Sequence, residues 1–257
     1  MSSIRRDGVE IYYEHHGCAR KSAPTMLLSH GYSATSAMWQ GQIEALTADH
    51  HLIIWDMRGH GRSDSPDDPA AYSEALTVAD MAALLDACEV DRAVIGGLSL
   101  GGYMSLAFHL DHPQRTHALM LFDTGPGYRN PQGRAGWNRT AEARARALES
   151  DGLAALGDGH EVRISQHRSA QGLAHAARGM LAQVDDRIMR SLATIQVPTL
   201  VLVGADDEPF RIPTDYMANK IANAERVVLD GAGHAANIDQ PEAFNAAVLA
   251  FLRSALG

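Results

Sequence analysis

A serine placed between glycines, Gly97-Leu98-Ser99-Leu100-Gly101, is the first candidate for chemistry in this sequence. It follows the apolar run Ala93–Leu98 and opens a helical pattern, which predicts a sharp strand-to-helix turn that exposes the serine hydroxyl. The glycines are needed because side chains at their positions would collide with neighbouring backbone. A hydroxyl held at the positive end of a helix is typical of a catalytic nucleophile. The competing interpretation is a tight turn with a bystander serine.

A serine hydroxyl becomes nucleophilic when a base takes its proton, and His234 is the candidate base among the thirteen histidines. It ends the segment Asp230-Gly231-Ala232-Gly233-His234, after the apolar run Arg226–Leu229. The glycines would let this loop carry the imidazole to the serine. No histidine pair has the helical spacing and nearby carboxylate of a zinc hydrolase, so we expect no metal site and no cofactor.

The imidazole needs a carboxylate to fix its tautomer and to stabilise its protonated form. Asp207 is the leading candidate, because it lies just beyond the apolar run Thr199–Val203. Two alternatives remain open. Asp206 is adjacent, and Asp123 ends the run Ala118–Asp123, from which it could also reach the histidine. The chain order serine, acid, histidine fits this triad on a strand–helix fold.

A developing oxyanion requires two backbone N–H groups aimed at it. Leu100, directly after the serine, would supply one of them. We expect the second from Tyr32, in the loop His30-Gly31-Tyr32 that follows the apolar run Thr25–Ser29. Gly31 would let the backbone turn without an obstructing side chain.

The elements that must position these residues alternate between strands and helices. One segment alternates like a half-exposed strand and six apolar runs fit strands buried on both faces: Val9–His15, then Thr25–Ser29, Leu52–Asp56, Ala93–Leu98, Ala118–Asp123, Thr199–Val203 and Arg226–Leu229. The helical patterns between them are Ser36–Leu46, Ser73–Ala87, Leu100–Leu110, Pro213–Ile221 and Pro241–Leu256. This alternation predicts an α/β fold, with a mostly parallel central sheet flanked by helices.

Residues 125–194 break the alternation. They show short helical patterns, such as Trp137–Glu149 and Leu173–Gln183, and no convincing strand. Such a stretch is too long for an ordinary crossover, so we predict an inserted helical cap. The core would then have two parts, residues 1–124 and 195–257. The cap would cover the carboxyl edge of the sheet, where open α/β sheets place their ligands.

The composition is that of an ordinary globular protein, with 46% apolar and 21% charged residues in a chain of 257. A net charge of −9 disfavours nucleic acid as a partner. No apolar run is long enough for a membrane span, and residues 1–10 contain no apolar signal core. A sparse pair of cysteines is more often a pair of reduced thiols, so we expect a cytoplasmic protein. We also expect no membrane partner, and either a monomer or a homodimer.

Five motifs together resemble the α/β-hydrolase superfamily, in its serine-nucleophile branch of small esterases, enol-lactonases and carbon–carbon bond hydrolases. In the order of that family they are His30-Gly31-Tyr32, Asp56-Met57-Arg58-Gly59-His60-Gly61-Arg62-Ser63, Gly97-Leu98-Ser99-Leu100-Gly101-Gly102, Gly204-Ala205-Asp206-Asp207 and Gly231-Ala232-Gly233-His234. The resemblance covers nearly the whole chain outside the expected cap. In that family the acid usually stands three residues after the glycine that ends its strand, which implies Asp207. The loop 56–63 is structural in the family, which implies no catalytic role for His60.

The residues and the resemblance together predict a serine hydrolase that cleaves a carboxylic ester of a small to medium substrate through an acyl-enzyme. Two alternatives stay open: a carbon–carbon bond hydrolase or enol-lactonase acting on a carboxylated metabolite, and a non-catalytic ligand receptor. For the carboxylated metabolite, the candidate contacts are Arg129, Arg134 and Arg139, with a solvated surface as the favoured role for most of them. An apolar substrate pocket is expected, with core packing as the competing role for its candidate residues, which are Trp39, Trp137, Met180 and Phe210.

Overall fold

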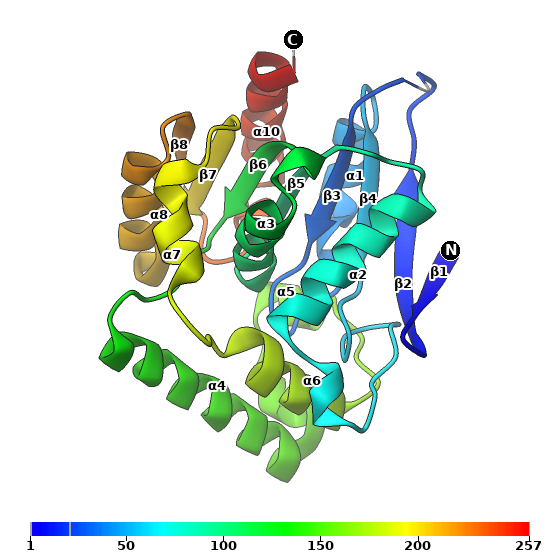
Figure 1. Ribbon diagram of the computed structural model, residues 1–257, viewed down its shortest axis with the longest axis vertical. Helices are drawn as coiled ribbons and strands as arrows, with labels where there is room; N and C mark the ends of the chain where they lie inside the picture. Colours follow the sequence, from blue (N-terminus) through cyan, green and yellow to red (C-terminus); the bar gives the residue numbers. More distant parts are fainter. Residues whose placement is uncertain (1, 21, 257) are drawn as a thin grey trace.

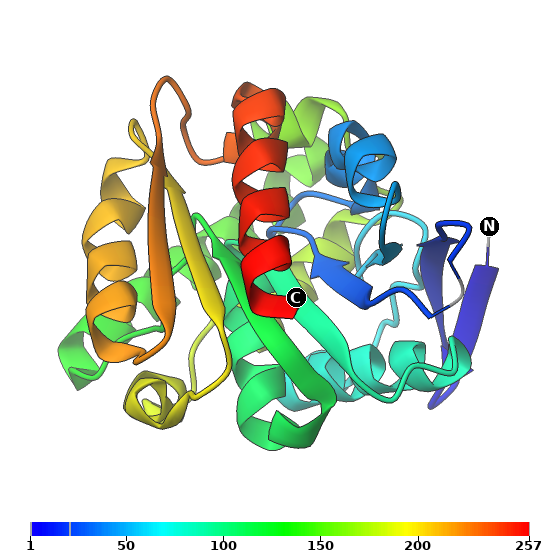
Figure 2. The same ribbon diagram turned by 90° about the horizontal axis from the view of Figure 1, so that it is seen from above.

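The computed structural model describes residues 2–20 and 22–256, and its centre is one eight-stranded sheet in the order β1-β2-β4-β3-β5-β6-β7-β8. The pairs β1–β2 and β2–β4 are antiparallel and all other pairs are parallel. The predicted α/β fold with a mostly parallel sheet is thereby confirmed (Figures 1 and 2). The strands are β1 (Ser2–Arg6), β2 (Val9–His16), β3 (Thr25–Ser29), β4 (His51–Trp55), β5 (Ala93–Leu98), β6 (Thr116–Phe122), β7 (Thr199–Gly204) and β8 (Ala224–Leu229).

Helices cover both faces of the sheet, with α1 and α10 on one face and α2 and α3 on the other (Figure 2). The long helices are α2 (Glu74–Ala87), α3 (Leu100–Asp111), α4 (Pro131–Asp151), α8 (Glu208–Lys220) and α10 (Pro241–Leu256). The shorter helices and turns are η1 (Ser36–Trp39), α1 (Gln40–Leu46), η2 (Pro69–Ala71), η3 (Pro113–Arg115), η4 (Gly152–Leu156), α5 (His160–Arg163), α6 (Ala170–Ala176), η5 (Ala177–Leu181), α7 (Arg187–Ser191), η6 (Leu192–Thr194) and α9 (Ala236–Asp239).

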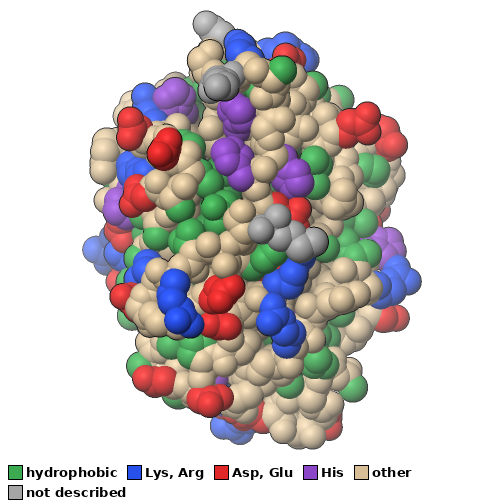
Figure 3. Space-filling view, turned by 90° about the vertical axis from the view of Figure 1, so that its right-hand side faces the viewer, with side chains coloured by type: hydrophobic (Ala, Val, Ile, Leu, Met, Phe, Trp, Pro, Cys, Tyr) green, Lys and Arg blue, Asp and Glu red, His purple; other side chains and the backbone are tan. Residues whose placement is uncertain are grey.

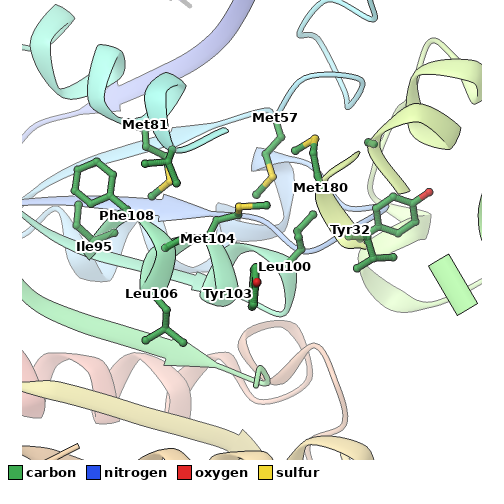
Figure 4. Close-up of a cluster of buried hydrophobic side chains, with 14 of the residues drawn as sticks. Tyr32, Met57, Met81, Ile95, Leu100, Tyr103, Met104, Leu106, Phe108 and Met180 are labelled. Carbon is green, nitrogen blue, oxygen red and sulfur yellow. The ribbon is translucent and has the colours of Figure 1, made fainter. Parts of the chain in front are cut away.

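Two hydrophobic cores lie on opposite faces of the sheet, because successive side chains of a strand point to opposite sides. Leu27 and Ile95 point into the core beneath α2 and α3, whereas Met26 and Val94 point into the core beneath α1 and α10. Figure 4 shows part of the first core, where Met104 and other side chains of α3 meet β5. This packing fixes the carboxyl ends of β5, β6 and β7 at a common edge.

Residues 125–194 are all described and contain helices but no strand. Helix α4 packs against α6 and η5, and these helices form the lower part of the molecule in Figure 1. Helix α7 instead packs against α3. The helical character expected for this stretch is therefore present, while its treatment as a separate cap domain stays a prediction.

Two features depart from the sequence pattern. Strand β1 has no apolar run to reveal it, because it is an edge strand with partly or fully exposed side chains. Its Arg6 is anchored instead by Asp80 of α2, with Nε to Oδ1 at 2.5 Å. Helix α8 begins at Glu208 rather than at Pro213, which lies inside the helix. The first-turn position of Pro209 explains the earlier start, since proline is well tolerated there.

The surface seen in Figure 3 has acidic and basic side chains interspersed, and histidine side chains gather in its upper half. The described side chains on this face therefore form no continuous basic surface of the kind that binds a phosphate backbone. Within residues 2–20 and 22–256, every helix is either too short or too polar to serve as a membrane span.

Candidate active site

Ser99 stands at the turn between β5 and α3, at the carboxyl edge of the sheet. Its backbone has φ 54° and ψ −113°, a strained conformation for a residue with a side chain. Two hydrogen bonds hold this turn. The Ser99 N–H donates to the carbonyl oxygen of Phe122 at 2.9 Å, and Thr124 Oγ1 donates to the Ser99 carbonyl oxygen at 2.6 Å. The strand-to-helix elbow predicted around Ser99 is therefore the local geometry.

The glycines on both sides of Ser99 are required by close backbone contacts. A Cβ on Gly97 would lie 2.5 Å from the carbonyl carbon of Gly101. A Cβ on Gly101 would overlap the carbonyl oxygen of Ser29 at the end of β3. Because backbone cannot move aside as a flexible side chain can, only glycine fits at either position.

Asp207 and His234 are brought together by the loops that follow β7 and β8. His234 Nδ1 lies 2.8 Å from Asp207 Oδ2, and Asp207 is 5% exposed. An ionised carboxylate only accepts hydrogen bonds, so Nδ1 carries the proton and Nε2 is left as the acceptor. The loops are joined directly, since the Asp206 N–H donates to the Ala232 carbonyl oxygen at 2.9 Å. The Asp206 side chain itself is exposed.

Asp123, the other alternative acid, lies beside Asp207 and does not take its place. It is buried at the end of β6 with φ 45°, and its Oδ1 accepts the Gly204 N–H at 2.8 Å. Burial, reinforced by the neighbouring Asp207 carboxylate, raises the pKa of Asp123 well above its usual range. Asp123 Oδ2 is enclosed and has no hydrogen-bond partner among the described residues, so a proton on this carboxyl would let it donate to the neighbouring Asp207. Of the three candidate acids, Asp207 is the one that is hydrogen-bonded to His234.

Phe210 connects the serine side of the site to the imidazole side. Its ring stacks on His234, with centroids 4.9 Å apart and planes 29° from parallel, and it lines a cavity that also contains Ser99. In the described residues no hydrogen bond joins Ser99 to His234. Such bonds are often long in unliganded sites and shorten when substrate binds.

The loop after β3 passes directly beside Ser99. A Cβ on Gly31 would lie 3.5 Å from the Ser99 Cβ, so the adjacent Tyr32 amide belongs to backbone that lies against the serine. The Leu100 N–H is the first in α3, where amides lack partners within the helix. The Tyr32 hydroxyl donates to the carbonyl oxygen of Leu173 in α6 at 2.9 Å, which ties this loop to the helical stretch.

His30 supports the same loop, a role that sequence reasoning did not assign. It is fully buried, with Nδ1 donating to the Gly31 carbonyl oxygen at 2.7 Å and Nε2 accepting the Met57 N–H at 2.9 Å. Burial lowers the pKa of His30 to about 4, so the ring is neutral at pH 7 and can make both bonds. One indication of this role is present in the sequence, where His30 directly precedes Gly31 in the predicted oxyanion loop.

A cavity of about 140 Å³ opens at Ser99 and reaches between α4 and α8. Of the four predicted substrate contacts, Trp137 and Phe210 line it. Gln183 and Tyr128, which sequence reasoning did not select, line it as well. The sequence could not predict these two residues as part of the site, because neither belongs to a motif or to a regular hydrophobic pattern.

Trp39 and Met180 lie away from this cavity and pack in the two cores. Trp39 is fully buried on the α1 and α10 face, with ring centroids 6.0 Å from Phe122 and 6.3 Å from Phe244. Met180 belongs to the core on the opposite face, together with Met57 (Figure 4). The prediction that these two residues contact substrate is therefore wrong for this cavity, because both are buried in the cores and neither lines it.

Comparison with known proteins agrees with this architecture. Residues 24–241 match the family described as alpha/beta hydrolase fold. A putative carbamate hydrolase RutD of Pseudomonas syringae is 30% identical, with 94% of this chain and 98% of the relative covered. The 3-oxoadipate enol-lactonase 1 of Acinetobacter baylyi is also 30% identical, with 91% of this chain and 90% of the relative covered.

Among solved structures, a thermophilic esterase from Thermogutta terrifontis superposes with a TM-score of 0.83 at 28% identity. The match covers 98% of this chain and 97% of the esterase. The resemblance inferred from the five sequence motifs is confirmed by these matches. The chain therefore belongs to the α/β-hydrolase fold family and is a hydrolase of that family.

Proposed function

We propose that the protein is a serine hydrolase that cleaves carboxylic esters of small to medium size through an acyl-enzyme intermediate. The observation that carries this proposal is the 2.8 Å hydrogen bond between Asp207 and His234, formed at the same sheet edge as the strained, half-buried turn of Ser99. A buried carboxylate, an oriented imidazole and a hydroxyl are the three groups that nucleophilic acyl transfer needs.

In the first half of the proposed reaction, His234 Nε2 takes the Ser99 proton while Ser99 Oγ attacks the ester carbonyl carbon. The carbonyl oxygen becomes an oxyanion, which the N–H groups of Leu100 and Tyr32 stabilise. Asp207 stabilises the imidazolium that forms. The carbon–oxygen bond to the alcohol then breaks, and the imidazolium gives its proton to the leaving alkoxide.

The second half repeats these steps with water as the nucleophile. His234 takes a proton from water, the hydroxide attacks the acyl-enzyme carbonyl carbon, and the same two N–H groups stabilise the second oxyanion. When the bond to Ser99 Oγ breaks, the imidazolium returns its proton to the serine. The products are a carboxylic acid and an alcohol, and the enzyme is restored.

The relatives support an acyl-transfer reaction in general, since their names include an esterase, an enol-lactonase and a carbamate hydrolase. Each of these names describes attack at a carbonyl carbon that carries a leaving heteroatom. We favour a simple ester over a carboxylated metabolite because none of the described residues that line the cavity at Ser99 is charged. The intact set of acid, histidine and serine also favours catalysis over a purely ligand-binding role.

The test is hydrolysis of a p-nitrophenyl ester by Ser99→Ala, with Ser150→Ala as its matched control. Ser150 is an exposed serine near the end of α4, so its loss removes a hydroxyl without touching the site. We expect Ser99→Ala to lose several orders of magnitude in kcat, while Ser150→Ala stays near the parent rate. Near-normal turnover by a folded Ser99→Ala protein would defeat the proposal.

A further inference from the structure

Among the described residues that line the cavity at Ser99, none is Asp, Glu, Lys, Arg or His, which disfavours a charged substrate there. The three arginines considered for a substrate carboxylate are not among the described residues that line this cavity. Arg134 donates to the Tyr128 carbonyl oxygen at 3.2 Å, Arg129 lies at a different hollow near Met189, and Arg139 is exposed. An ionised group entering this apolar cavity would lose its hydration without gaining a counter-charge.

Gln183 is a polar residue of this lining that three hydrogen bonds hold in place. Its backbone N–H donates to Asn138 Oδ1 at 2.8 Å, and its carbonyl oxygen accepts from Asn138 Nδ2 at 2.9 Å. Its side-chain Oε1 accepts the Tyr128 N–H at 3.2 Å. These three bonds fix both the position of the residue and the orientation of its amide, because a backbone N–H requires an oxygen opposite it.

The side-chain nitrogen of Gln183, Nε2, takes part in none of these three hydrogen bonds. Among the described residues Nε2 has no hydrogen-bond acceptor, and it is not one of the fully enclosed polar atoms. The residue is only 9% exposed and lines the cavity, so the nitrogen is reached from the cavity. A fixed N–H donor in apolar surroundings favours a ligand that offers a neutral oxygen, since the donor otherwise stays unpaired when water leaves.

The size of the cavity limits the group that can enter. A volume of about 140 Å³ is close to that of the engineered cavity of about 150 Å³ that takes up benzene in another protein. Since benzene has six carbon atoms, we expect the part of a substrate that fills this cavity to have about six non-hydrogen atoms. The aromatic and aliphatic walls, which include Trp137, Phe210 and Leu181, suit an apolar chain.

We propose that Gln183 determines specificity, by donating a hydrogen bond from Nε2 to a neutral oxygen on the acyl group that enters the cavity. The preferred substrates are then uncharged esters with a short apolar acyl chain that carries one keto or ether oxygen. This inference rests on the proposed function, because it names the substrate class of the same site.

The experiment compares kcat/KM for three methyl esters, whose alcohol is too small to compete for the cavity. Methyl hexanoate is the apolar reference, methyl 5-oxohexanoate adds a neutral oxygen, and monomethyl adipate places a carboxylate on a chain of similar length. We expect the oxo ester to exceed the reference by about 3- to 10-fold, the range that one neutral hydrogen bond supplies. We expect the carboxylated ester to fall at least about 10-fold below the reference.

The variants Gln183→Met and Gln183→Glu both remove the Nε2 donor, and the second keeps an oxygen for the Tyr128 N–H. In both, the ratio of kcat/KM for the oxo ester to that for methyl hexanoate should fall to about one or below. Gln196→Glu makes the same charge change at an exposed position before β7, at the opposite end of that strand from Asp207, and should keep the parent ratio. Because the readout is a ratio within each protein, partial loss of folded enzyme does not alter it.

Equal ratios in the parent and in both Gln183 variants would overturn the inference, and so would efficient hydrolysis of monomethyl adipate. Either result would leave the serine hydrolase proposal standing, because ester cleavage would still be observed. Absence of any ester hydrolysis, together with an unreactive Ser99, would instead overturn the proposed function itself.

Discussion

At the residue scale, two carboxyl groups meet at the ends of β6 and β7, and only one of them bonds to the imidazole. Two neighbouring carboxylates in a buried site cannot both ionise easily, so one keeps its proton. Asp123 is the protonated member because it is the more buried, and Asp207 is free to act as the acceptor for His234. Asp123 therefore has a structural role as the protonated carboxyl, whereas Asp207 is the acid of the triad.

Replacing Asp207 by Asn should lower kcat by about 10⁴-fold, the loss measured for the same change in the serine-protease triad, because the amide favours the wrong imidazole tautomer. The matched control is Asp206→Asn, which makes the same change at the adjacent exposed residue and should stay near the parent rate. Steady-state hydrolysis of a p-nitrophenyl ester measures both. An equal loss in the two variants would contradict the assignment of the acid.

Asp123→Asn tests the protonated state of the second carboxyl through the pH dependence of stability. A carboxyl whose pKa is raised on folding binds more protons in the native state, so it lowers the free energy of unfolding as pH rises above about 4, the unfolded value. Asn keeps the donor and cannot ionise.

The Asp123→Asn variant should therefore match the parent near pH 4 and become progressively more stable than the parent toward pH 8. Thermal or urea unfolding at a series of pH values measures this difference. A difference between the two proteins that stays constant across that range would show that Asp123 is ionised in the folded protein.

The sequence predicted these residues unevenly, for physical reasons. Ser99 and His234 carry glycine-rich contexts that constrain the backbone, so their positions could be found from the residues alone. The choice among three acids could not be made in that way, because it depends on how adjacent parallel strands are aligned. Gln183 could not be found either, since its role comes from its contacts with Asn138 and Tyr128, which are distant in sequence.

At the scale of secondary-structure elements, the elbow holds β3, β5 and α3 so close together that only glycine fits between them. Buried parallel strands and amphipathic helices have strong sequence patterns, which is why most of these elements were predicted within a few residues. Strand β1 was missed because an exposed edge strand needs no apolar side chains. The irregular helices from α5 to η6 were also hard to delimit, since tertiary packing rather than helix propensity fixes their ends.

The close approach at the elbow predicts opposite effects for two glycine-to-alanine changes. Gly101→Ala should lower the free energy of unfolding by at least about 2 kcal/mol, because its Cβ would overlap the backbone of β3. Gly136→Ala, inside α4, has its nearest obstacle 3.7 Å away and should raise stability by up to about 1 kcal/mol. Urea unfolding of both variants measures these changes. Similar effects at the two sites would contradict the packing described for the elbow.

At the scale of the whole molecule, a buried ion pair joins segments that are far apart in the sequence. Arg58 follows β4 and is 2% exposed, and its Nε lies 2.6 Å from Oδ2 of Asp80 in α2. The same carboxylate also accepts from Arg6 at the end of β1. This network connects the edge of the sheet, the loop before η2 and α2, and it contributes to a stable frame for the catalytic edge.

Breaking that network should be far more damaging than breaking a surface pair on the same helix. Asp80→Asn leaves Arg58 buried without its counter-charge and should cost about 3–5 kcal/mol. Asp86→Asn removes the exposed partner of Arg115 and should cost no more than about 1 kcal/mol. Urea unfolding of both variants measures these losses. The shift of the midpoint reports the change in the free energy of unfolding, provided that the slope against urea concentration is the same as in the parent. A small effect of Asp80→Asn would show that this network does not organise the fold.

The central claim is that His234 activates Ser99, and covalent labelling measures this most directly. The parent enzyme is treated with a fluorophosphonate probe, and the modified peptide is identified by mass spectrometry. We expect one phosphonyl group on Ser99 in the parent, and labelling slowed by orders of magnitude in folded His234→Ala, because an unassisted hydroxyl is a poor nucleophile. Labelling at another serine, or equally fast labelling of Ser99 without His234, would contradict the account.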